Sequence, residues 1–161
     1  MPIAQAMCTS FKSDILLGVH DFRAASGDTF KIALYTSTAD LNANTTAYAA
    51  TNEVTGTNYT AGGNTLTKSG VSSVITSSTL GVGFTTFSDT TWTNATITAR
   101  GALIYNNTPS ANNAANVLVA NASVCVLDFG SDKTSTAGDF TILFPSPATN
   151  VNAIIRIGST T

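Results

Sequence analysis

The stretch Thr29-Phe30-Lys31-Ile32-Ala33-Leu34-Tyr35-Thr36 alternates between large apolar side chains and other residues. Phe30, Ile32 and Leu34 fall on one face of an extended chain, because successive side chains of a β-strand point to opposite sides. This alternation predicts a strand with one buried and one more polar face. The fold is therefore expected to contain a β-sheet with a hydrophobic inner face.

Further segments rich in β-branched and aromatic residues follow this strand, and Gly, Asn, Asp and Pro separate them. Short strands without a repeated strand–helix–strand spacing favour two stacked antiparallel sheets over a parallel α/β fold. We therefore predict a mainly β protein, an antiparallel β-sandwich of the jelly-roll or immunoglobulin-like kind. The additional predicted strands are Thr65–Lys68, Val71–Thr76, Gly83–Ser88, Thr91–Asn94, Ala95–Tyr105, Val117–Asp128, Asp139–Phe144 and Ala153–Ile157.

The inner faces of these strands supply the predicted core. Gly101 interrupts one of them and indicates a bulge or a close approach of two backbones. Residues 37–58 are rich in Thr, Asn and Ala and carry no sustained period, so a long surface loop is expected there, with one short element near residues 48–54. The predicted core residues are Phe30, Ile32, Leu34, Trp92, Ile97, Leu103 and Tyr105.

One amphipathic helix is predicted before the strands, over Ser10–Phe22. Its apolar stripe, with spacings of four, four and three residues, consists of Phe11, Ile15, Val19 and Phe22. A helix with a single apolar face must pack on something larger, either its own sheet or a neighbouring subunit. We place the predicted intermolecular contact on this stripe, and divide the chain into an N-terminal arm and helix, residues 1–27, and a β-sandwich, residues 28–161, within one domain.

The composition argues against several classes of function. Of the 161 residues only 10% are charged, against about 25% in ordinary soluble proteins, and the net charge is −2. The basic residues are dispersed, which disfavours nucleic-acid binding, and no apolar run reaches the roughly 18 residues of a membrane span. The N-terminus does not resemble a secretory signal, so folding in the cytoplasm is expected. The dispersed basic residues are Lys12, Arg23, Lys31, Lys68, Arg100, Lys133 and Arg156.

Residues that could carry chemistry are few. The single histidine, His20, excludes sites that need two His ligands, and no nucleophile-elbow motif surrounds any Ser or Cys. Asp128, Asp132 and Asp139 could hold Ca²⁺ in principle, but the first two are also ordinary turn-forming residues. We expect no catalytic site, metal or cofactor. Cys8 and Cys125 are expected to be two thiols rather than one disulfide.

Trp92, the sole tryptophan, has two possible roles. An exposed indole can stack against a sugar ring, whereas an isolated aromatic residue inside a strand is more often part of the core. The core position is the favoured interpretation. An exposed Trp92 beside a second aromatic residue would favour glycan binding.

Several segments together resemble a family of small structural proteins encoded by tailed bacteriophages. The resemblance implies a virion component without catalysis, located in the particle and built to contact other virion proteins. A capsid decoration or cement protein is favoured, bound to the major capsid protein and forming a homo-oligomer. The alternative is a tail, neck or fibre component, with or without a contact to host glycans. The segments are Phe30–Ser37, Thr90–Asn106, Val126–Lys133, Phe140–Ile142 and Ile154–Ile157.

Overall fold

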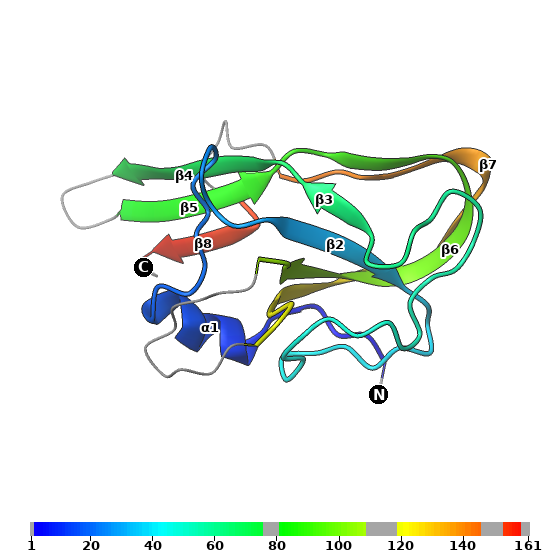
Figure 1. The fold of residues 1–161 in the computed structure, drawn as a ribbon, viewed down its shortest axis with the longest axis horizontal. Helices are drawn as coiled ribbons and strands as arrows, with labels where there is room; N and C mark the ends of the chain where they lie inside the picture. The colour runs from blue at the N-terminus through cyan, green and yellow to red at the C-terminus, as the bar shows by residue number, and fades with distance from the viewer. Residues whose placement is uncertain (1, 76–80, 109–118, 146–152, 159–161) are drawn as a thin grey trace.

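A computed structural model describes residues 2–75, 81–108, 119–145 and 153–158. It contains two antiparallel sheets and one short helix, which confirms the predicted mainly β sandwich architecture (Figure 1). The first sheet has the strand order β1 (Ala6–Met7), β7 (Ser123–Ile142), β6 (Thr90–Asn106), β2 (Phe30–Tyr35) and β3 (Asn64–Leu66). The second has the order β4 (Lys68–Ile75), β5 (Gly81–Phe87) and β8 (Ile155–Gly158), and the helix α1 spans Thr9–Leu16.

The strands β6 and β7 are much longer than the sequence predicts. The two segments predicted between residues 91 and 105 form one strand, and β7 continues through residues 128–132, where we expected a turn. Figure 1 shows this β6–β7 ribbon curving back at one end of the molecule. Register shifts allow the curvature, including one at Ala99/Gly101, where the sequence predicts a bulge. The predicted strand ends at Thr76 and Val117 lie outside the described residues.

The strand β2, which lies between β6 and β3, is buried on both faces rather than on one. Ala33 and Tyr35, on the face expected to be more polar, are as inaccessible as Ile32. The reason is the segment of residues 37–63, which forms no helix or strand but packs over this face. Tyr48 stacks on Tyr105 with ring centroids 4.7 Å apart. The long loop is thus a cover for the sheet, which periodicity within β2 could not reveal.

All seven residues that the sequence assigns to the core are buried. The N-terminal segment contributes to the same core, since Ile3, Phe11 and Phe22 pack in one cluster with the residues of the sheets. Phe22 stacks on Phe30 at a centroid distance of 4.3 Å. Residues 2–27 therefore form part of the sandwich rather than a separate arm.

The helix ends six residues earlier than predicted, because Gly18 stops it. Gly18 has a φ of 71° and its N–H donates to the Ile15 carbonyl, while the Val19 N–H donates to the Asp14 carbonyl. These two bonds form a Schellman motif, which terminates helices at a left-handed glycine. Val19 and Phe22 therefore lie beyond the helix, so the predicted four-residue stripe does not lie on one helix face.

Candidate interaction surfaces

The predicted contact stripe is largely hidden within the protein's own core. Phe11, Val19 and Phe22 are buried, and Ile15 is partly buried against the same cluster. Placing the intermolecular contact on these side chains was wrong, because they already have intramolecular partners. The apolar side chains that this region does expose are Leu16, with 86% of its surface accessible, and Leu17, with 46%.

His20 is enclosed rather than presented at a surface. The Asn106 Nδ2 lies 3.1 Å from His20 Nδ1 and also donates to Asp28, while Asn106 Oδ1 accepts from the Thr108 N–H. These contacts direct the amide nitrogen of Asn106 at the ring, so His20 Nδ1 accepts and Nε2 carries the proton. Burial lowers the pKa of His20, against the opposing effect of Asp14 and Asp28. The geometry is that of a neutral core histidine.

The two cysteines are free and buried. Burial raises the pKa of both thiols, that of Cys125 to about 12, so neither is activated as a nucleophile. No pair of a reactive thiol and an exposed base is therefore available at these positions.

The three aspartates considered for Ca²⁺ form no common site in the described part of the chain. Asp128 accepts from the Gly130 N–H at 2.9 Å and from Arg100 at 3.2 Å, contacts that lower its pKa. Asp139 instead accepts from the Asn94 N–H at 3.1 Å. Among the described residues, no three His, Cys, Asp or Glu side chains form a group that could hold a metal ion, and no helix is long and apolar enough to span a membrane.

Trp92 occupies the core position and offers no stacking platform. Only 3% of its surface is exposed. Its ring stacks on Tyr59 at 5.9 Å and meets Phe140 edge-on at 6.1 Å, with both partners from the same chain. The feature that would have favoured glycan binding, an exposed indole beside a second aromatic residue, is not found here.

A buried glutamate with three hydrogen-bond donors was not predicted from the sequence. The Glu53 carboxylate accepts hydrogen bonds from Tyr48 Oη at 2.6 Å, Tyr59 Oη at 2.7 Å and the Gly62 N–H at 2.7 Å. Burial and the adjacent carboxylate raise the pKa of both tyrosines. Because both carboxylate oxygens accept from protein donors, Glu53 fixes the loop of residues 37–63 on the sheet.

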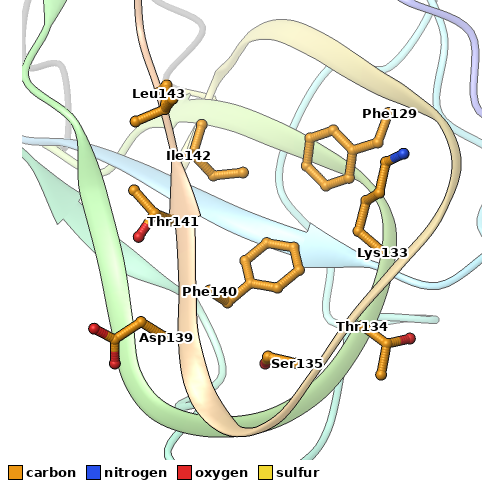
Figure 2. A pocket seen from close by; sticks show the side chains of 9 residues that line it. All are labelled: Phe129, Lys133, Thr134, Ser135, Asp139, Phe140, Thr141, Ile142 and Leu143. Atoms are coloured by element: carbon orange, nitrogen blue, oxygen red, sulfur yellow. The ribbon is translucent and has the colours of Figure 1, made fainter.

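An open groove lies inside the bend of β7 and has a volume of about 540 Å³. Figure 2 shows side chains from both limbs of the bent strand around it. The rings of Phe129 and Phe140 approach to 6.3 Å, and Leu143 at the rim is 74% exposed. The groove can accept an apolar side chain from outside. Its lining consists of Phe129, Lys133, Thr134, Ser135, Asp139, Phe140, Thr141, Ile142 and Leu143.

A second apolar surface lies on the three-stranded sheet. The register pairs Ile75 with Gly81, Ser73 with Gly83, and Gly83 with Ile157, so these side chains share one face. The glycines leave its centre open, since the nearest atoms to a Cβ added at Gly81 or Gly83 are backbone oxygens at 3.6 and 3.9 Å. Val71, opposite Thr85, belongs to the same face. We call Val71, Ile75, Gly81, Gly83 and Ile157 the apolar face.

The apolar face continues the surface that this sheet turns toward the core. Phe87 and Ile155 lie in the core cluster, and alternation along β5 and β8 places Gly83, four residues from Phe87, and Ile157, two residues from Ile155, on the same side. Beyond the core this side is uncovered by the described residues: Val71 is 67%, Ile75 82% and Ile157 62% exposed. Grouped exposed aliphatic side chains of this kind mark interaction sites.

No protein-family model, curated protein or solved structure matches this chain.

Proposed function

We propose that this chain is a non-catalytic structural protein of a tailed-phage particle, a decoration protein that stabilises the capsid shell through protein–protein contacts. The observation that carries the proposal is the apolar surface that the fold leaves uncovered, at the groove in β7 and on the apolar face. Both surfaces are costly to expose to water, at roughly 25 cal/mol per Å² of apolar area, and suit burial against other subunits.

Two further features support this function. The chain is poor in charged residues, and a surface of small hydroxyl and amide groups is easier to desolvate over a broad contact than a charged one. The candidate reactive groups His20, Cys8 and Cys125 are enclosed in the core. In the proposed particle, the β7 groove receives an apolar side chain of the major capsid protein.

The copy number in purified particles tests the proposal. A decoration protein should approach the major capsid protein in molar amount, measured by quantitative mass spectrometry of gradient-purified phage. A few copies per particle would instead indicate a tail, neck or fibre component. Absence from the particle would refute a virion role altogether.

The role of the groove has its own test. Leu143→Asp places a charge at the groove rim and should reduce incorporation of the protein into particles at least tenfold. Thr136→Asp, on the same strand but outside the groove lining, is the matched control and should be incorporated normally. Equal incorporation of the two variants would exclude the groove as the shell contact.

A further inference from the structure

The free strand edges of this protein differ in how they are protected. An unpaired edge can template the addition of another strand, and natural proteins guard such edges with charges, bulges or proline. Beyond its short pairing with β1, β7 carries exposed Asp132 and Lys133 and has left-handed backbone at Gly130 and Ala137, with φ of 74° and 47°. Its edge is guarded against regular pairing.

The edge of β4 has much less protection. Among the described strands β4 pairs only with β5, so its other edge has no partner strand within the described part of the chain. Residues 69–75 contain no charged side chain and no proline. The left-handed backbone of β4, at Gly70 with a φ of 82°, is confined to the bulge between Lys68 and Val71, and past this bulge the pairing with β5 is regular. Val71, Ser72, Ser73 and Ile75 are all exposed. Such an edge favours pairing with another strand.

We propose that two copies of this chain pair antiparallel through β4, with Ser73 on the twofold axis and Val71 opposite the partner's Ile75. The inference deepens the proposed function, because it rests on the premise that the chain works through protein contacts and names one partner, a second copy. An axis through Ser73 perpendicular to the sheet turns the same face of both copies to the same side. The two three-stranded sheets then form one six-stranded sheet.

The sequence of β4 suits pairing with itself in this register. On each side of the axis, Val71 of one copy faces the partner's Ile75. The exposed serines lie between these two aliphatic contacts. Lys68 is the only charged residue of β4. The two Lys68 residues would lie ten positions apart, roughly 33 Å at about 3.3 Å per residue, well beyond the Debye length. No like charges therefore oppose each other along the pair.

The pairing also extends the apolar face across the interface. Val71 and Ile75 of each copy become neighbours of the same residues in the partner, so part of their exposed surface is covered. A strand from a different protein would cover the same edge but would have no reason to place identical residues on an axis. That difference makes the partner identifiable by cross-linking.

Site-directed disulfides test the register. Ser73→Cys should form an intermolecular disulfide with its own counterpart under mild oxidation, in most of the protein. Ser72→Cys is the matched control. Ser72 lies opposite the partner's Val74, so the two residues 72 are two positions apart along the strands, and their Cα atoms lie beyond the roughly 7 Å that a disulfide spans. The wild-type chain, with both thiols buried, should stay unlinked. Cross-linking of Ser72→Cys, or of neither variant, would overturn the proposed register.

Charge exchange tests the same pairing without oxidation. Val71→Glu and Ile75→Lys should each raise the dimer dissociation constant at least tenfold, measured by light scattering against the chain mass of 16.5 kDa. The double variant places Glu opposite Lys at both ends and should restore dimerisation. Both positions are exposed, so the variants should keep the wild-type circular dichroism spectrum and melting temperature.

The outcomes separate this inference from the proposed function. A wild-type chain that is strictly monomeric at millimolar concentration overturns the pairing, whatever its abundance in particles. A chain that dimerises as described but is absent from purified particles refutes the virion role and leaves the pairing intact.

Discussion

At the scale of single residues, Trp92 shows how the interior of the sandwich is filled. The ring lies between Tyr59, from the long loop, and Phe140, from β7, and thereby joins two segments that are distant in sequence. Its Nε1 is buried without a hydrogen-bond partner among the described atoms. The residue therefore contributes by packing rather than by polar contacts.

Truncation of Trp92 should consequently leave a cavity. We expect Trp92→Ala to lower the free energy of unfolding by about 3 to 5 kcal/mol, measured by urea denaturation. Trp92→Phe retains an aromatic ring and removes the unpaired N–H, so it should lose less than half as much. Leu143→Ala, at a position with 74% exposure, is the control and should stay near wild type. An unchanged Trp92→Ala melt would mean that the ring does not support the core.

His20 should make the stability of the protein depend on pH. Since burial lowers the pKa of His20 below its ordinary 6.5, the unfolded chain binds the proton more tightly than the folded one. Stability is therefore lost as the pH falls from 6.5 toward the folded-state pKa, by about 1.4 kcal/mol for each unit of difference. A protonated Nδ1 would also direct its hydrogen at the amide nitrogen of Asn106.

Melting temperatures measured from pH 7.5 downward test this dependence. His20 is the only histidine, and the aspartates whose pKa is lowered have an ordinary value of 3.8, so the two titrations are separable. His20→Phe keeps an aromatic ring beside Phe11 and Phe22. In this variant the melting temperature should stay constant as the pH falls below 6.5, until the aspartates begin to titrate. An unchanged slope in that variant would assign the dependence to other groups.

Single residues also mark the limit of what the sequence predicts. The residues assigned to the core follow from hydrophobic patterning and are all buried. Glu53 could not be found in this way, because its partners Tyr48, Tyr59 and Gly62 lie in a segment without periodicity. Only the folded loop brings their donors to one carboxylate.

At the scale of elements, the N-terminal segment is held where the β6–β7 ribbon changes register. A Cβ at Gly101 would lie 2.5 Å from the Leu127 carbonyl oxygen and 2.9 Å from Ile3 Cγ2. The absence of a side chain therefore permits both the close strand approach and the seating of Ile3. The Ala4 N–H, which donates to the Leu41 carbonyl at 2.8 Å, reports on this seating.

Gly101→Ala should accordingly destabilise the fold by roughly 1 to 3 kcal/mol and accelerate hydrogen exchange of the Ala4 amide. Gly138→Ala, in the partner strand, meets its nearest atom at 3.7 Å and should change stability by less than about 0.5 kcal/mol. If both variants have the same melting temperature and the Ala4 amide stays protected from exchange, the close contacts of Gly101 with Leu127 and Ile3 do not require a glycine at this position.

Element boundaries show why local patterns were insufficient. The bulge at Gly101 is recognisable from a glycine inside an apolar strand, whereas the Schellman stop at Gly18 was masked by the apolar spacing that continues through Val19 and Phe22. The joining of the segments between residues 123 and 142 depends on cross-strand pairs such as Thr98 with Thr134, at 2.9 Å between their hydroxyl oxygens. Polar residues on both faces of a strand leave no alternation to detect.

At the scale of the whole molecule, the described part of the fold encloses the candidate reactive residues and, besides Leu16 and Leu17, leaves apolar side chains exposed on two surfaces. One is the groove in the bend of β7, and the other is the apolar face beside the open edge of β4. Neither was predicted from the sequence, because each depends on which strands lie at the edges and on where a sheet extends past the core. Both suit a protein that works by contact with other subunits.

The measurement that tests this account most directly is electron cryo-microscopy of purified phage particles at a resolution that shows strands. We expect the β-sandwich on the outer capsid surface in many copies, with the groove lined by Phe129 and Phe140 against the major capsid protein. Particles whose shell and tail contain no density for this fold, although the protein is made during infection, would contradict the proposed role.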